Sequence, residues 1–156
     1  MDTMQALISR VSVPPKLLSD PAPRGADLDE IMAAAMSAPD HGKLSPFQFI
    51  TIEGDARAKL GDVFVEALKK RDPSADEAMI EKERNRPMRS PLIVVAVAKI
   101  DEHNEKVPAV EQAVTTGIAA YNMIVAAQAK GYGGILLTGK NAKDLNVKAA
   151  LGLEPT

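Results

Sequence analysis

A long helix with small side chains is the feature that most constrains the fold of this 156-residue chain. The apolar spacing predicts a helix from Pro108 to Lys130, and Gly131 is expected to close it. An unusual number of its side chains are small, namely Thr115, Thr116, Gly117, Ala119, Ala120, Ala126 and Ala127. Because small side chains leave the helix backbone accessible, another backbone segment can approach it closely. We therefore expect this helix to lie at the centre of the fold.

The rest of the chain predicts shorter helices and three strands. The helices are expected near residues 4–10, 27–38, 55–68, 74–85 and 142–151, with Asp27, Asp55 and a Ser74–Glu77 capping box at three of their starts. The strands are expected at 47–52, 91–98 and 135–138, the second of them buried on both faces. This order predicts an α+β fold in a single domain of residues 1–156. Three short strands make a thin sheet, so we expect a C-terminal strand to be missing.

Composition excludes several classes of function. Lysine and arginine number 19 against 21 acidic residues, which is not the basic excess of a nucleic-acid-binding protein. The absence of cysteine excludes disulfides, thiolate metal sites and a cysteine nucleophile. The longest apolar run, Leu92 to Ala98, is too short to span a bilayer, and the N-terminus lacks a signal-peptide pattern. We therefore expect a cytoplasmic protein that binds neither nucleic acid nor membrane.

Two loops carry the polar groups most suited to binding a ligand. Arg10 and Ser12 stand where the first helix gives way to proline-containing backbone, and a guanidinium beside a hydroxyl can hold a phosphate. A solvated helix end is the alternative interpretation of this pair. The loop from Pro39 to Phe47 contains His41, and polar loops between structured elements often bind ligands. An ordinary turn is the alternative there.

Other motifs argue against a catalytic nucleophile or a metal. Asp40 and His41 are adjacent and cannot easily align as a relay, and no Gly-x-Ser-x-Gly elbow is present. The segment 101–105 has no second histidine at helical spacing, so no metal site is expected. Residues 134–141 nearly match a phosphate-binding loop, but Asn141 replaces the magnesium-binding hydroxyl and the apolar strand lies inside the motif. A P-loop-like nucleotide binder is therefore only a remote alternative.

Taken in order, several segments resemble the nitroreductase family, and most closely its short bacterial NAD(P)H nitroreductases. The matching segments are residues 7–12, 30–42, 46–49, 89–94, 106–108, 111–112 and 131–134. The resemblance covers nearly the whole chain. It implies a nitroreductase-like α+β fold whose mixed or antiparallel sheet is flanked by helices. It also implies FMN as the cofactor and a homodimer that holds the flavin at the subunit interface, with the long small-sided helix at that interface.

The resemblance implies an activity as well. In this family, hydride passes from NAD(P)H to flavin N5 and then to a nitroaromatic, quinone or related acceptor in a ping-pong cycle. Because the cofactor carries the redox chemistry, the resemblance implies no catalytic protein residue and no metal. The alternative is a flavin-binding module with little or no turnover.

Carried over by position, the resemblance implies contacts with both cofactors. The FMN contacts are Arg10, Val11 and Ser12 near the phosphate and ribityl chain, Ser37 and His41, and the segment Leu136, Leu137 and Thr138. The other subunit is expected to supply His41. A weaker correspondence assigns NAD(P) binding to Ala126, Ala127, Gln128, Ala129, Lys130 and Gly131.

Some positions depart from the family pattern. Val11 stands where a second arginine is usual, and Leu136 and Leu137 replace a pair that usually contains tryptophan. Phe47 and Val110 replace expected tryptophans. The family's final strand, Gly-Phe-x-x-x-Gly-Thr-Pro, is absent, and its loss is expected to expose a sheet edge. These departures are the basis for the alternative of a flavin-binding module.

Overall fold

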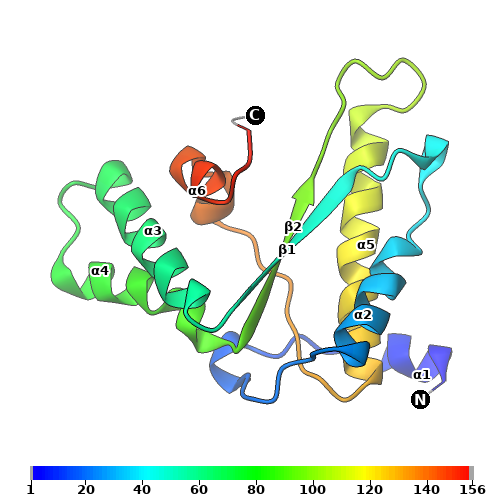
Figure 1. Ribbon diagram of the computed structural model, residues 1–156, viewed down its shortest axis with the longest axis horizontal. Helices are drawn as coiled ribbons and strands as arrows, with labels where there is room; N and C mark the ends of the chain where they lie inside the picture. The colour runs from blue at the N-terminus through cyan, green and yellow to red at the C-terminus, as the bar shows by residue number, and fades with distance from the viewer. Residues whose placement is uncertain (1, 155–156) are drawn as a thin grey trace. The chain divides into compact units, whose positions relative to one another are not determined.

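Helices account for most of the regular structure in the computed structural model, which describes residues 2–154 (Figure 1). The α-helices are α1 (Thr3–Ile8), α2 (Ala26–Met36), α3 (Ala56–Arg71), α4 (Glu77–Arg84), α5 (Ala109–Ala129) and α6 (Leu145–Ala150). Strands β1 (Phe47–Glu53) and β2 (Leu92–Ala98) form a two-stranded antiparallel sheet. Short 3₁₀ helices are η1 (Pro15–Leu17), η2 (His41–Lys43), η3 (Arg86–Arg89) and η4 (Lys140–Lys143). These elements confirm the predicted α+β class.

The chain divides into two compact units. The first comprises the described residues of Met1–Thr51 and Val94–Leu136, and it contains α1, α2 and α5. The second comprises the described residues of Ile52–Ile93 and Leu137–Thr156, and it contains α3, α4 and α6.

Helix α5 organises the first unit, as the sequence predicts. Helix α2 packs along α5, and α1 packs against it as well (Figure 1). The buried cluster at this contact consists of Ala35, Ala38, Phe47 and Ala119. Ala35 and Ala119 are fully buried, and their methyl side chains permit the close approach of α2 to α5. The small residues of α5 thus build the core of this unit.

Both ends of α5 are well defined. Pro108 occupies the N-cap position, and Gly131 has a φ of +89°, which a glycine adopts without strain. The Tyr132 amide donates to the Ala127 carbonyl at 2.9 Å, which closes the last turn as predicted. Buried Gln112 makes hydrogen bonds of 2.8–2.9 Å to the backbone of Asp101 and Val107, and so holds the 101–107 loop against the helix. No helix within residues 2–154 is long and apolar enough to cross a bilayer.

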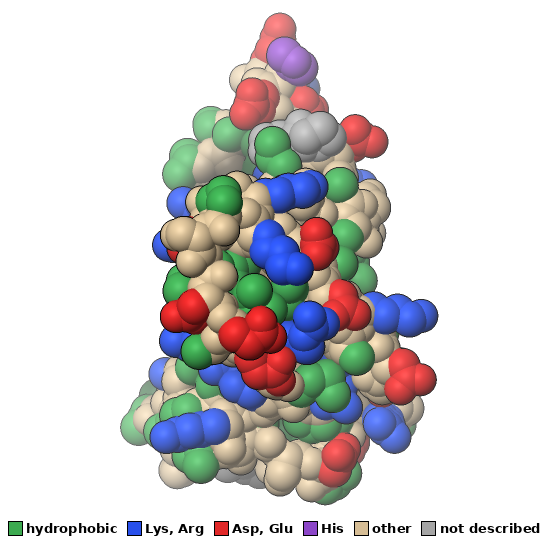
Figure 2. All heavy atoms as spheres, turned by 90° about the vertical axis from the view of Figure 1, so that its left-hand side faces the viewer, with side chains coloured by type: hydrophobic (Ala, Val, Ile, Leu, Met, Phe, Trp, Pro, Cys, Tyr) green, Lys and Arg blue, Asp and Glu red, His purple; other side chains and the backbone are tan. Residues whose placement is uncertain are grey.

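The second unit is built around α3. This helix packs against α4, η3 and α6, and its buried residues are Leu60, Gly61, Val65, Ala67 and Leu68. Val147 of α6 is also buried. On its surface, Figure 2 shows acidic and basic side chains interspersed over the face that carries α3 and α4, without a continuous field of one sign.

The predicted third strand at residues 135–138 is wrong. Residues 132–139 have irregular backbone, and within the described part of the chain no strand pairs with them. The Gly134 carbonyl instead accepts one hydrogen bond, from the Val13 amide at 3.0 Å. Leu136 and Leu137 are more than half exposed. A short run of apolar residues suits a strand only when a partner strand is available to pair with it.

The sheet is therefore thinner than predicted. It has two strands where three were expected among residues 2–154. The residues of β2 are half-buried except for exposed Ala98, and not buried on both faces as predicted. Two strands present too little surface to cover both faces of a neighbour, so an apolar strand remains half-exposed here.

The predicted helix at 142–151 is divided into two pieces. Asp144 interrupts it with an extended conformation and caps α6, because its carboxylate accepts from the amides of Asn146 at 2.9 Å and Val147 at 3.4 Å. The residues before Asp144 form only the 3₁₀ helix η4. Gly152, with a φ of +71°, ends α6 as predicted.

Two predicted helix caps are also wrong. Helix α4 is capped by Asp76, whose carboxylate accepts from the Met79 amide at 2.8 Å, and Ser74 instead bonds Asp72. Helix α2 begins after Gly25, and Asp27 lies in its first turn. At α4 several acidic or hydroxyl residues compete for the N-cap position, and spacing alone does not choose between them, whereas α2 starts at a glycine without a side-chain cap.

Candidate functional site

The segment around Arg10 and Ser12 lies against the C-terminal end of α5. The Val11 amide donates to Oε1 of Gln128 at 2.9 Å, and Nε2 of Gln128 donates to the Ser9 hydroxyl at 3.2 Å. The Val13 amide is held by the carbonyl of Gly134. These bonds fix the backbone on both sides of residue 11 and leave the side chains of Arg10 and Ser12 for other partners.

Arg10 and Ser12 form a small polar group on this segment. Nη1 of Arg10 lies 3.4 Å from the Ser12 hydroxyl, and Ser12 is exposed. Val11 between them is 60% exposed, so its side chain contributes little to packing. A guanidinium and a hydroxyl side by side can both donate to a phosphate. The geometry is therefore compatible with the predicted phosphate site.

The loop that carries His41 is held rigidly after α2. The Asp40 carboxylate accepts from the amides of Leu44 at 3.1 Å and Ser45 at 2.7 Å. Three residues in it have positive φ: Gly42 at +77°, Lys43 at +53° and Ser45 at +48°. Such conformations are strained for residues other than glycine and persist only where the surroundings impose them, often at functional sites.

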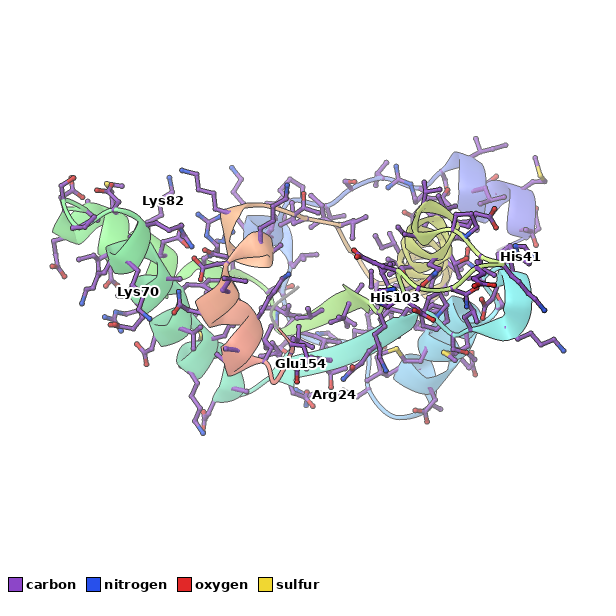
Figure 3. The ribbon with its side chains drawn as sticks, turned by 90° about the horizontal axis from the view of Figure 1, so that it is seen from above. Arg24, His41, Lys70, Lys82, His103 and Glu154 are labelled. Atoms are coloured by element: carbon purple, nitrogen blue, oxygen red, sulfur yellow. The ribbon has the colours of Figure 1, made fainter. Side chains whose placement is uncertain are left out.

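His41 is paired with Glu111 beside an open hollow. Nδ1 of His41 lies 2.7 Å from Oε2 of Glu111, in the first turn of α5. Figure 3 shows His41 on the turn between α2 and β1. The hollow has a volume of about 260 Å³ and is lined by Pro39, His41, Val110, Glu111, Val114, Thr115 and Ile118. Its walls are mainly apolar, so this pair supplies most of its hydrogen-bonding capacity.

The other predicted FMN contacts lie after α2 and in the segment 136–138. Ser37 follows α2, and its hydroxyl donates to the Ala34 carbonyl at 2.8 Å. Leu136 belongs to the first unit, whereas Leu137 and Thr138 belong to the second. All three lie in exposed, irregular backbone. Their predicted contacts with FMN stay predictions.

The two polar residues of the predicted NAD(P) segment have protein partners. The side-chain amide of Gln128 bonds the Val11 amide and the Ser9 hydroxyl, as described above. Nζ of Lys130 lies 2.8 Å from Asp27 and 2.6 Å from Glu30. The role of residues 126–131 in NAD(P) binding stays a prediction, and the side chains of Ala126, Ala127 and Ala129 carry no polar group.

The ion pairs of Lys130 also shift the pKa values of the groups that take part in them. Hydrogen bonds from Lys130 and then from Tyr132 hold the pKa of Asp27 below its ordinary value. The same carboxylate, with Glu30, raises the pKa of Lys130, so its ammonium stays charged and paired. The Tyr132 hydroxyl donates to Asp27 at 2.6 Å, which raises the pKa of Tyr132. This cluster joins the start of α2 to the end of α5.

Sequence reasoning missed the two side chains that hold these loops. Glu111 was assigned no role at the site, and Gln128 was assigned to NAD(P) and not to the Arg10–Ser12 segment. The sequence feature that could have pointed to this role of Gln128 is its polar side chain in a part of the helix that is otherwise apolar. Within residues 2–154, no group of three or more histidine, aspartate or glutamate side chains is placed to hold a metal ion.

Comparison with known proteins settles the family. The Nitroreductase family model matches residues 7–156. The chain belongs to the nitroreductase family. Two relatives carry provisional names as NAD(P)H nitroreductases: YdjA of Escherichia coli, 40% identical, and a Haemophilus influenzae protein, 38% identical. Each alignment covers 97% of this chain and 80% of the relative.

Solved structures with the nitroreductase fold match nearly the whole chain. A nitroreductase-like protein from Bacillus cereus superimposes with a TM-score of 0.81 at 20% identity, over 99% of this chain and 79% of its own. A BluB-like flavoprotein from Clostridium difficile has a TM-score of 0.70 at 19% identity, over 99% and 84% of the two chains. At these identities the likeness establishes the fold alone. It confirms the nitroreductase-like fold predicted from the sequence.

Proposed function

We propose that this nitroreductase-family protein is an FMN-dependent NAD(P)H oxidoreductase and acts as a single domain. The main observation behind this proposal is the Arg10–Ser12 pair. Its backbone is held by Gln128, and the family resemblance assigns this position to the flavin phosphate. The residues fit an anionic cofactor, since both side chains are hydrogen-bond donors. Membership in a family with NAD(P)H-named relatives, and the flavoprotein among the structural neighbours, support the proposal.

When bound, FMN would supply the redox chemistry, taking hydride from NAD(P)H and passing it to a nitroaromatic, quinone or related acceptor. The chain's own residues bind and orient. Arg10 neutralises phosphate charge, Ser12 donates a hydrogen bond, and Gln128 keeps their backbone in place. His41 contributes a hydrogen-bonding group at the apolar hollow.

Replacing Arg10 by alanine is expected to raise the dissociation constant for FMN about tenfold. A charge-assisted hydrogen bond contributes about 1.5 kcal/mol or more to binding, and the exposed segment places Arg10 at the lower end of that range. The measurement is quenching of flavin fluorescence on titration with protein. Lys82→Ala is the matched control, because it removes an equal charge from an exposed position on α4 (Figure 3).

Gln128→Ala tests the same segment without touching a charge. Loss of the Val11 and Ser9 hydrogen bonds should loosen the backbone under Arg10, and weaken FMN binding by less than Arg10→Ala does. Equal affinities of wild type, Arg10→Ala and Gln128→Ala would refute the phosphate site. If FMN binds but NADH oxidation with nitroaromatics and quinones is absent, the protein is a flavin-binding module and not the proposed enzyme.

We further propose that two chains assemble through α5, with the flavin at their interface. Over residues 110–121, one face of α5 is exposed and apolar or small, with Val110, Val114, Gly117 and Tyr121 on it. Glu111, beside His41, and Gln128, beside Arg10, are about 25 Å apart along the helix at 1.5 Å per residue. This distance exceeds the length of FMN, so one chain does not bring both groups to one flavin along this helix. If two α5 helices packed antiparallel, the Glu111 end of each helix would lie beside the Gln128 end of the other.

If the protein is a dimer, light scattering at micromolar concentration should give the mass of two chains. Val114→Glu should halve that mass, because it places a charge on the exposed apolar face. Glu102→Gln, in the exposed 101–105 loop, should leave the mass unchanged. A wild-type protein with the mass of one chain, at concentrations where FMN binds, would refute the interface site.

A further inference from the structure

The pairing of His41 with Glu111 has a chemical consequence for the hollow beside it. A neutral imidazole carries its proton on one nitrogen, and the hydrogen bond made by one nitrogen decides which form is present. An ionised carboxylate only accepts hydrogen bonds. Nδ1 of His41 lies 2.7 Å from Oε2 of Glu111, so in this pair Nδ1 carries the proton.

We infer that Glu111 is a positioning residue that makes Nε2 of His41 the acceptor for a ligand in the hollow. With Nδ1–H donated to Glu111, the neutral ring has one lone pair left, on Nε2. The ligand group that suits it is an N–H or O–H donor, such as the hydroxyls or the imide of a flavin. This inference rests on the proposed function, because it takes the ligand to be FMN.

The surrounding structure supports a fixed ring at this position. Glu111 lies in the first turn of α5, where the helix dipole favours a negative side chain. The backbone before His41 is held by Thr115, whose hydroxyl donates to the Pro39 carbonyl at 2.9 Å. After it, a Cβ at Gly42 would lie 3.2 Å from Val107, so the turn packs closely against the 101–107 loop. The ring is therefore held by its own hydrogen bond and by backbone fixed on both sides.

The apolar lining gives this hydrogen bond its importance. Side chains of Val110, Val114 and Ile118 cover much of the hollow and offer a bound ligand no polar partner. A polar ligand group that packs against these side chains loses water on that side, and a group left unpaired there is costly. The tautomer of His41 thus decides whether a ligand donor or a ligand acceptor is accommodated at this place.

The first test is the nitrogen NMR spectrum of the histidine side chains, without any ligand. The spectrum is recorded at about pH 9, well above the ordinary histidine pKa of ~6.5, so that the neutral form of the imidazole is observed. We expect Nδ1 of His41 to give the signal of a protonated nitrogen and Nε2 that of an unprotonated one. Glu111→Ala should shift this pattern toward the opposite tautomer. His103, the other histidine in the chain, is the internal reference, and His103→Gln assigns the signals.

The second test is a double-mutant cycle for FMN binding. Glu111→Ala should weaken binding about fivefold, as loss of one well-placed hydrogen bond does. In a His41→Ala background the same change should have no effect, because Glu111 acts only through His41. Glu102→Ala is the control for removal of an exposed carboxylate.

The outcomes separate this inference from the proposed function. Unchanged His41 signals in Glu111→Ala, or an equal effect of Glu111→Ala with and without His41, overturn the positioning role. A wild-type protein that binds no FMN overturns the proposed function and the ligand named here. In that case the NMR comparison still decides whether Glu111 selects the tautomer.

Discussion

Gly61→Ala is expected to destabilise the protein by about 3 kcal/mol, the cost of forcing an extra group into a well-packed contact. Gly61 is buried in α3, and a Cβ at this position would clash with the carbonyl oxygen of Arg84 at the end of α4. Ordinary glycine-to-alanine changes inside a helix gain about 1 kcal/mol from helix propensity. The contact reverses that sign here, because the obstacle is backbone and cannot rotate away.

Urea denaturation followed by circular dichroism measures this difference. Lys59→Ala, at an exposed position of the same helix, is the control and should change the free energy of unfolding by less than about 0.5 kcal/mol. A Gly61→Ala protein as stable as the wild type would mean that α4 moves away from α3 at no cost. The result bears on the fold alone, since no proposed ligand contact lies on these helices.

Asp144→Ala is expected to cost about 3 kcal/mol of stability. The carboxylate is buried, caps α6, and accepts from Nη1 of Arg71 at 2.5 Å. Alanine removes the cap and leaves a partly buried guanidinium without this partner, and breaking such a pair costs about 3–5 kcal/mol when both ions are buried. Arg71 is 28% exposed, so we expect the lower end of that range. Asp144→Asn should lose less, because asparagine is also a good N-cap.

Asp144 should also make the stability of the protein fall in acid. Burial raises the pKa of Asp144, but hydrogen bonds from Arg71 and Asn146 outweigh burial, and the pKa lies below its ordinary value. The stabilisation is therefore complete above the unfolded pKa of about 3.9, and is lost as the pH falls through the lower folded value. Comparing urea midpoints between about pH 5 and 2 should show a smaller decline for Asp144→Asn than for the wild type. Parallel declines would exclude a contribution from this group.

Local patterns of residue type predicted several elements close to their observed bounds. The apolar spacing and closing glycine of α5 gave nearly its observed bounds, Ala109–Ala129. Apolar spacing also predicted helix α1, and a run of β-forming residues predicted strand β1. Predictions failed where a tertiary partner decides the outcome. Residues 135–138 have the composition of a strand but no strand beside them in the described part of the chain.

The candidate site shows the same division. Arg10, Ser12 and His41 were identified as polar residues in loops and as positions shared with the nitroreductase family. Which side chains hold them was not accessible from the sequence, because Gln128 is 117 residues from Val11 and Glu111 is 70 residues from His41. Contacts at such separations leave no periodic signal.

What the sequence determined by itself was the family, the α+β class and the small-sided helix α5, because each depends on residue types and their spacing along the chain. Only the tertiary structure decided which polar side chains have partners: Gln128 with the Ser9–Val11 segment, Lys130 with two carboxylates, and His41 with Glu111. The physical reason is that a hydrogen bond or ion pair depends on angstrom-scale distances between atoms. Packing sets those distances only after distant parts of the chain have come together.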